Sequence, residues 1–153
     1  MFKPHKQAKA RRRSAVALIK YVLAMKKPDV LLSHCEELLD VLLWKITEAD
    51  GKYNTPFKSE GALHRKTKLR HDHVYQRSKM IARLVKAAPQ EIDKILRRAI
   101  ACTVMIKEHH RLSKFDKKYD GWERYQRAGI QVMDTRTNKR IKMSGYRNLR
   151  KRE

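Results

Sequence analysis

Hydrophobic residues recur at helical spacing through the first third of the chain. The run AVALIKYVLAMK predicts a helix that Ser14 caps and that ends at Lys27, because the proline that follows disfavours helical backbone in the residue before it. Residues 29–50 predict a second and more apolar helix, whose hydrophobic positions include Leu31, Cys35, Leu38, Leu42 and Trp44. Together the two segments predict an N-terminal helical hairpin over residues 14–50.

Shorter elements of both kinds follow the hairpin. Residues 52–61 are rich in turn formers and predict a loop, whereas residues 63–76 combine dense charge with a few hydrophobic positions, as a partly exposed strand does. We expect Asp120 to cap a helix that Gly129 ends. The other predicted helices cover residues 78–87, 89–100 and 107–114, and the other predicted strands cover residues 101–106 and 130–134. These elements indicate a predominantly helical α+β fold.

Positive charge is concentrated at both ends of the chain. Residues 1–13 contain six Lys or Arg residues and no acidic residue, and residues 135–153 contain eight against Glu153 alone. Such segments repel themselves and predict a mobile arm and a basic tail that order on a phosphate backbone. The predicted organisation is therefore a basic arm over residues 1–13, the hairpin, a core over residues 51–134, and a basic tail.

Composition narrows the class of partner. The 153 residues contain 38 Lys and Arg against 16 Asp and Glu, a formal net charge of +22 at pH 7, and 41% are hydrophobic. The hydrophobic fraction supports a folded core, while the charge opposes compaction unless a polyanion such as nucleic acid neutralises it. No apolar run approaches the roughly 20 residues of a membrane-spanning helix, so we expect a soluble, cytoplasmic protein without a membrane partner. Two cysteines are too few for a disulfide framework or a four-cysteine zinc site.

The second predicted helix has an acidic polar face inside this basic protein. Over residues 29–50, Lys45 is opposed by six acidic residues, which are Asp29, Glu36, Glu37, Asp40, Glu48 and Asp50. Either this face packs near the protein's own basic surface, or the helix docks another protein. The second interpretation makes residues 29–50 a candidate site for a protein partner.

Four of the seven histidines fall in two short groups. His71 and His73 flank Asp72 on a predicted strand, and His109 and His110 lie near the start of a predicted helix. Successive side chains of a strand face opposite ways, so Asp72 points away from both neighbours unless the strand ends or bulges there. A single site that uses Asp72 together with His73 therefore requires the strand to end at this point.

The two groups lie in runs that resemble a known family of nucleases. DHVYQRS begins at Asp72 and CTVMIKEHHRLSK begins at Cys102, and together they resemble the HNH endonucleases of the ββα-metal superfamily. In that family an Asp-His pair is followed by a second strand and by a helix that bears the last metal ligand. The resemblance implies a small ββα-metal-like core, with two helices inserted between the motifs. It also implies metal-dependent hydrolysis of phosphodiester bonds in nucleic acid, with DNA favoured over RNA.

The resemblance implies roles for individual residues as well. Asp72 and His110 would ligate one divalent metal ion, Mg²⁺ or Mn²⁺, and His73 would be the general base that deprotonates the attacking water. Arg111, next to the helix ligand, would face a phosphate. A carboxylate suits such hard cations, and a histidine near its reference pKa of about 6.5 accepts a proton at neutral pH. The asparagine of many family members has no counterpart in residues 101–103, and His109 is an alternative to His110 as the ligand.

Basic residues near the two motifs are candidate phosphate contacts, and they are Arg65, Lys66, Lys68, Arg70, Arg77, Lys107 and Arg111. The motifs also have structural interpretations. Asp72 would pair with Arg70 or Lys68 on a solvated strand, or the four grouped histidines would form a structural zinc site. The functional alternatives to a nuclease are a non-catalytic nucleic-acid-binding protein and a basic subunit of a larger nucleoprotein assembly.

Overall fold

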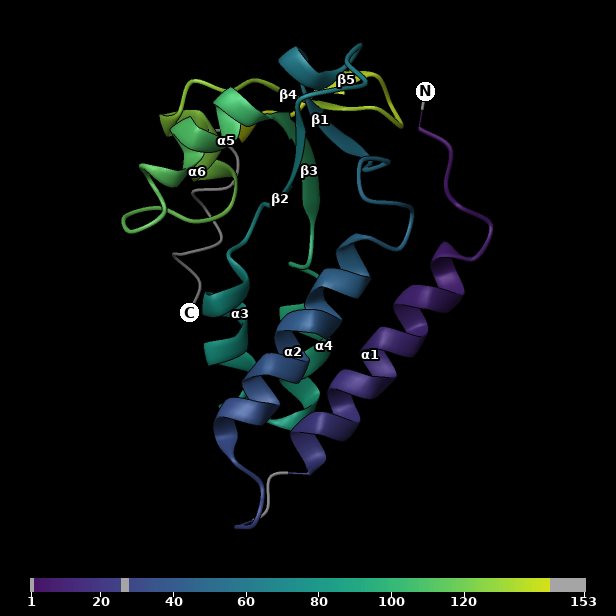
Figure 1. Ribbon diagram of the computed structural model, residues 1–153, viewed down its shortest axis with the longest axis vertical. Coiled ribbons are helices and arrows are strands. Elements are labelled where there is room, and N and C mark those ends of the chain that lie inside the picture. Colours follow the sequence, from purple (N-terminus) through teal and green to yellow (C-terminus); the bar gives the residue numbers. More distant parts are fainter. Residues whose placement is uncertain (1, 26–27, 144–153) are drawn as a thin grey trace.

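A helical hairpin forms the narrow end of the molecule (Figure 1). The computed structural model describes residues 2–25 and 28–143. Helix α1 spans Ala8–Ala24 and helix α2 spans Leu32–Thr47, and the two pack against each other. The predicted N-terminal hairpin is thereby confirmed. Within the described ranges, no helix has the length and apolar character needed to cross a membrane.

Five short strands form one mixed sheet at the broad end. They are β1 (Phe57–Ser59), β2 (Leu69–His73), β3 (Ala101–Met105), β4 (Val132–Asp134) and β5 (Lys139–Arg140), in the order β2-β3-β1-β4-β5. β3 pairs antiparallel with β2 and parallel with β1, and the other two pairs are antiparallel. Because it has a neighbour on each side, β3 is buried along almost its whole length.

Four further helices complete the fold. α3 (Arg77–Leu84) and α4 (Ile92–Leu96) lie between β2 and β3 in the chain and pack beside the hairpin, α4 being preceded by a 3-10 turn over Pro89–Glu91. α5 (Ile106–Ser113) follows β3 directly, and α6 (Trp122–Arg127) precedes β4. The predominantly helical α+β class is confirmed.

Glu108 explains why α5 begins where it does. Its Oε2 atom accepts the backbone N–H of Met105 at 2.8 Å, just before the first turn of α5, and also accepts from the hydroxyl of Ser59 in β1. A carboxylate in this position satisfies a donor that the helix leaves unpaired. The side chain is buried, so it also joins α5 to the sheet.

Two hydrophobic clusters hold these layers together. One joins the hairpin to α3 and α4, around fully buried side chains such as Ile19 and Leu39. The other lies between the sheet, α5 and α6, around Val104 and Trp122. Tyr75, just after β2, packs against both. A fully buried aliphatic side chain stabilises the fold by about 1.5–3 kcal/mol. Because Tyr75 contacts both clusters, the end of β2 is held between two packed layers.

The order of β2, β3 and α5 corresponds to the arrangement that the nuclease resemblance implies. β2 and β3 pair antiparallel from Leu69 opposite Met105 to His73 opposite Ala101. α5 continues directly from β3 and packs against both strands. α3 and α4 lie between β2 and β3 in the chain.

Residues 2–13 of the predicted basic arm are ordered against the rest of the protein. α1 begins at Ala8, well before the predicted cap at Ser14. The backbone N–H of His5 donates to Asp50 Oδ1 at 2.9 Å, and Arg12 pairs with the same carboxylate. The prediction of an arm that orders only on a phosphate backbone was wrong, because the acidic end of the hairpin supplies the counter-charge.

Some boundaries also differ from expectation. β1 lies within the predicted loop, and β5 lies within the predicted basic tail, of which residues 144–153 are outside the described residues. Gly121, not Asp120, holds the cap position of α6, and Asp120 Oδ1 instead accepts the backbone N–H of Gln76 at 2.9 Å. Gly129, with φ of 63°, follows the end of α6 as predicted.

Candidate functional site

β2 presents polar side chains on two opposite faces. Its pairing with β3 runs in regular register through Asp72, which lies opposite Cys102. Side chains therefore alternate through this point. Asp72 faces α5 and α6, whereas His71 and His73 face the C-terminal end of α2.

The Asp72 carboxylate is buried among hydrogen-bond donors. Its Oδ2 atom accepts from the guanidinium of Arg124 and from the hydroxyl of Tyr125, both on α6. On the other side, Nε2 of His109 in α5 lies 3.6 Å from Oδ1. Burial raises the pKa of the Tyr125 hydroxyl well above its usual value, so this group keeps its proton and acts as a donor.

Arg124 balances the charge of this carboxylate. Its side chain is only 4% exposed, as is that of Asp72. The guanidinium also donates to the backbone carbonyl of His73 at 2.8 Å and to Asp116 at 2.7 Å. Burial raises the pKa of the Asp72 carboxyl, and the charge of Arg124 acts in the opposite direction. The protein thus supplies its own cation at the position where the resemblance implies a metal ion.

His71 and His73 form a second polar cluster at the end of α2. Nε2 of His73 lies 2.9 Å from the hydroxyl oxygen of Thr47, and Nε2 of His71 lies 3.1 Å from the same atom. The Trp44 ring packs against both imidazoles, with centroid distances of 5.0 Å to His71 and 4.9 Å to His73. Both histidines are therefore held by side chains of the hairpin.

The protonation of this cluster follows from its acceptors. Nδ1 of His71 lies 2.6 Å from the carbonyl oxygen of Lys52, which can only accept, so this nitrogen carries the proton. Burial lowers the pKa of His71. Burial, with the charges of His71 and Arg77 adding to it, lowers the pKa of His73 to about 3. Both rings are neutral at pH 7, and a histidine with so low a pKa is a weak general base.

The three residues expected around one metal ion do not come together. Asp72 and His73 lie on opposite faces of β2, since the strand neither ends nor bulges between them. His110 is exposed on α5, and the neighbouring His109 is the histidine beside the carboxylate. The structure therefore contradicts a single site made of Asp72, His73 and His110. The same division rules out a zinc site made of both histidine pairs.

The residues present do not form a ready metal centre. Among the residues that the structure describes, no group of three or more His, Cys, Asp or Glu side chains is placed to hold a metal ion. Asp72 and His109 supply two ligands, and the Arg124 guanidinium already binds the carboxylate. The thiols of Cys35 and Cys102 are buried and unpaired.

Most of the predicted phosphate contacts lie on the surface. The exposed ones are Arg65, Lys66, Lys68, Arg70, Lys107 and Arg111. Arg77 differs, because it is half-buried, pairs with Asp40 at 2.8 Å and lies over the Trp44 ring. These contacts engage the guanidinium within the protein, so Arg77 is not counted among the exposed cations. The Arg77–Asp40 pair also supports the interpretation that acidic residues of α2 pack near the protein's own basic surface.

Sequence reasoning missed the side chains that complete both clusters. Trp122 and Tyr125 are buried in the core, and Arg124 between them is buried as well. Its position between two core aromatic residues is a signal that could have identified it. Thr47 carries no comparable signal, because its role depends on where the end of α2 meets β2.

The arrangement around β2 combines two neutral histidines on one face with a neutralised carboxylate on the other, beside exposed cations. Such a surface can bind phosphates, but it does not bring a metal ion and the predicted base to one phosphodiester bond. Comparisons with protein-family models, curated proteins and solved structures found no match to this chain. Its function is therefore inferred from its own charges and contacts.

Proposed function

We propose that the protein binds nucleic acid through a face built by β2 and α5. This α5 face carries four exposed cations, Lys68, Arg70, Lys107 and Arg111. Arg70 lies two residues before Asp72, and therefore on the side of β2 that α5 covers. The carbonyl of Lys68 accepts the backbone N–H of Ile106 at 2.8 Å, which fixes it at the start of α5. Lys107 and Arg111 are four residues apart and share one side of that helix.

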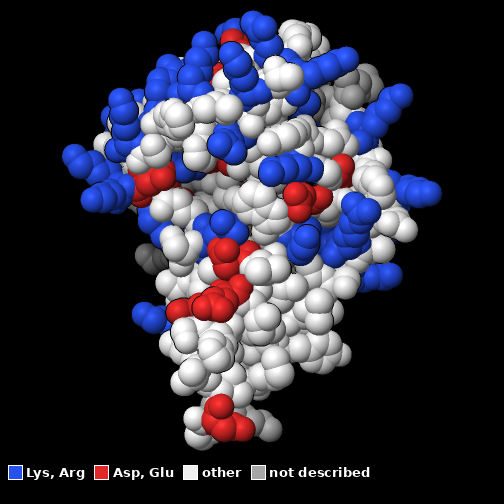
Figure 2. Space-filling model, in the orientation of Figure 1, with Lys and Arg blue, Asp and Glu red and all other residues white. Residues whose placement is uncertain are grey.

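The distribution of charge carries this proposal. Figure 2 shows Lys and Arg side chains gathered over the broad part of the molecule, whereas the narrow hairpin is mostly uncharged with a few acidic side chains. The chain as a whole carries a net charge of +22. Cations that contact phosphates release condensed counterions, and this release drives binding that is independent of base sequence. A duplex lying across the α5 face would meet several such cations at once.

The proposal predicts a measurable dependence on salt. Each phosphate contact contributes about −0.9 to the slope of log K against log salt concentration for duplex DNA. We expect the double variant Lys107→Ala/Arg111→Ala to make that slope shallower by about 1.8, measured by fluorescence anisotropy of a labelled duplex. The matched control is Lys45→Ala/Arg97→Ala, which removes two exposed cations from α2 and the end of α4. Equal slopes for the two double variants would contradict the proposal.

Phosphodiester hydrolysis is a second candidate function, and one observation favours it. β2, β3 and α5 follow the order of a ββα-metal core, and His109 approaches Asp72 to 3.6 Å between the strand and the helix. If Arg124 leaves the carboxylate, these two side chains can ligate a divalent ion. His73 would not touch that ion, because it lies on the other face of β2.

Plasmid nicking in Mg²⁺ or Mn²⁺ tests this second candidate. We expect Asp72→Asn and His109→Ala to abolish nicking and His73→Ala to retain it. Asp72→Asn keeps the shape of the side chain but removes the buried counter-charge of Arg124, so urea denaturation of each variant must show a folded protein before its nicking is compared. Absence of nicking by the unmodified protein, or nicking that both variants retain, rules out hydrolysis at this site.

The hairpin favours a protein partner alongside nucleic acid. Large hydrophobic side chains are exposed on α1, on α2 and in the turn between them, and they are Leu18, Tyr21, Met25, Val30, Leu31, Leu32, Leu38 and Val41. Contiguous exposed apolar surface marks interaction sites. We expect the isolated chain to self-associate in sedimentation velocity and Leu38→Glu to reduce this. A monomer at every concentration would contradict the docking role.

A further inference from the structure

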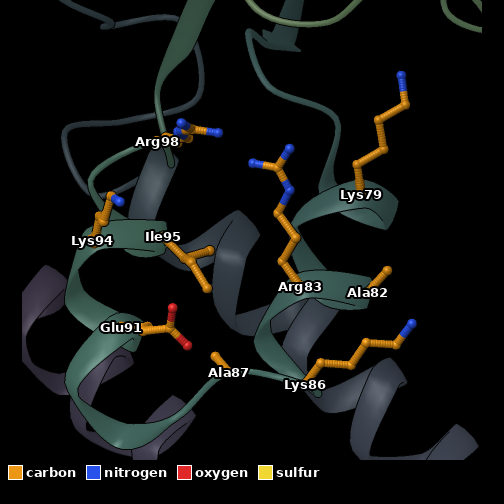
Figure 3. Close-up of a pocket in the computed structure, with 9 residues that line it drawn as sticks. All are labelled: Lys79, Ala82, Arg83, Lys86, Ala87, Glu91, Lys94, Ile95 and Arg98. Carbon is orange, nitrogen blue, oxygen red and sulfur yellow. The ribbon is translucent and has the colours of Figure 1, made fainter. Parts of the chain in front are cut away.

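A cationic cleft lies between α3 and α4 (Figure 3). Its volume is about 610 Å³, which is within the range of small-molecule binding sites. The lining includes five Lys or Arg side chains and one acidic side chain, Glu91. No residue of the α5 face and no residue of the Asp72 cluster lines the cleft. It is therefore a separate feature of the described part of the chain.

The charges in this cleft are separated in space. In Figure 3 the guanidinium groups of Arg83 and Arg98 are directed into one end, and the carboxylate of Glu91 points into the other. The side chain of Ile95 extends between them. Arg83 is exposed, whereas Arg98 is half-buried with its guanidinium carbon 5.7 Å from the centre of the Tyr75 ring. This cation–π contact holds the guanidinium of Arg98 beside the Tyr75 ring.

Lys79 and Glu91 of the lining also make hydrogen bonds within the protein. Lys79 Nζ donates to the carbonyl oxygens of Asp116 at 3.1 Å and Tyr119 at 3.3 Å, so it joins α3 to the segment before α6. Glu91 Oε2 accepts the backbone N–H of Ala88 at 3.0 Å, at the turn that precedes α4. The position of this carboxylate is therefore fixed before any ligand enters.

Each part of the cleft suits a different chemical group. Paired guanidinium groups suit a phosphate, because their planar forks donate several hydrogen bonds to its oxygens. Ile95 and the methyl groups of Ala82 and Ala87 suit a flat and weakly polar body. The Glu91 carboxylate suits an N–H donor at the far edge of that body.

A nucleotide unites these three groups in one molecule. We propose that the α3/α4 cleft binds a phosphorylated nucleotide whose base carries an amino group, either free or at the 5′ end of a nucleic-acid strand. The phosphate lies against Arg83 and Arg98, the base lies on Ile95, and the amino group donates to Glu91. Lys86 and Lys94 raise the positive potential at the entrance.

Calorimetric titration with guanosine 5′-monophosphate tests the proposal. We expect saturable binding, and guanosine without the phosphate should bind at least about tenfold more weakly, since hydrogen bonds to charged groups are of that strength. Arg83→Ala should cause a similar loss, and Arg83→Lys, which keeps the charge but removes the fork, should cause part of it. The matched control is Arg97→Ala, which removes an exposed cation beside Arg98 that does not line the cleft. Its affinity should be unchanged.

Further titrations separate the base from the phosphate and the two sources of the ligand. Uridine 5′-monophosphate lacks the amino group and should bind more weakly than the guanosine compound, a preference that Glu91→Gln should reduce. Competition by an oligonucleotide only when it carries a 5′-phosphate supports a strand end, and competition by neither form supports a free nucleotide. Absence of saturable heat, equal competition by inorganic phosphate, or an equal loss in Arg97→Ala would overturn the proposal.

Nucleotide binding in the cleft is expected to be independent of nucleic-acid binding at the α5 face. Lys107→Ala/Arg111→Ala should bind guanosine 5′-monophosphate as the unmodified protein does, because neither side chain lines the cleft. Arg83→Ala should in turn leave the salt dependence of duplex binding unchanged. Loss of nucleotide binding in the α5-face variant would also contradict the cleft as the site.

Discussion

Replacing Arg124 with methionine removes the cation that balances Asp72. Both side chains are 4% exposed, and the guanidinium donates to the Asp72 carboxylate and to the backbone carbonyl of His73. Breaking a buried pair by removing one partner leaves an uncompensated charge, which costs about 3–5 kcal/mol. We expect Arg124→Met to lower the free energy of unfolding by that amount, measured by urea denaturation at pH 7.

Two further measurements test the cause of this loss. Without Arg124 the pKa of the buried Asp72 carboxyl rises further above its unfolded value, so the folded variant binds a proton more readily than the unfolded chain does. The deficit should therefore shrink as the pH falls from neutral toward acid. The double variant Asp72→Leu/Arg124→Met removes both charges and should recover most of the loss, since apolar replacements of a buried pair are often neutral.

Arg127→Met is the matched control on the same helix. Its side chain is 44% exposed, and its guanidinium lies 3.7 Å from the carboxylate of Glu123, one turn away. An exposed pair of this kind contributes at most about 1 kcal/mol. A deficit in Arg124→Met no larger than that of the control, or one that does not shrink in acid, would refute the claim that Arg124 neutralises a buried charge.

Two more predictions concern the histidine cluster and the start of α5. Burial lowers the pKa of His73 in the folded protein to about 3, below its usual value of 6.5, so its stabilising contribution is present above pH 6.5 and is lost as the pH falls toward 3, by up to about 1.4 kcal/mol per pH unit. Urea titrations across this range should show a shallower loss for His73→Gln, and parallel curves for the two proteins would contradict the assignment. Gly61→Ala places a Cβ 2.8 Å from Glu108 Oε1, and thermal melts should show a loss of roughly 1–3 kcal/mol from overpacking. Gly129→Ala, whose Cβ meets no atom within 4 Å at φ of 63°, tests backbone strain alone and should lose about 1 kcal/mol.

The elements with strong local patterns were predictable from the sequence, and the short strands β1 and β5 were not. The hairpin, β3 and α5 have apolar periodicity or β-branched runs that indicate their structure directly. β1 has three residues, and it is a strand because β3 and β4 pair with its two edges. β5 has two exposed basic residues, and its pairing with β4 likewise depends on tertiary contacts.

The division of the candidate site between two faces of β2 followed from the alternation of side chains along a strand. The alternation of a strand predicts that Asp72 and His73 diverge, and they do. The family resemblance implied instead that they act together at one site, Asp72 as a metal ligand and His73 as the general base. The group that occupies the carboxylate is Arg124, which is 52 residues away in the chain. No local pattern identifies a partner at that separation.

The central place of β3 in the sheet has a consequence for the order of folding. β2 pairs with β3, and β1 pairs with β3 and β4, so neither early strand has its neighbour until residues 101–105 have been synthesised. The hairpin needs only contacts that are close in the chain, which form fastest. The α1–α2 hairpin can therefore form during synthesis, before β3 is available. Until then the strand edges of β1 and β2 are unpaired and open to contacts with other chains.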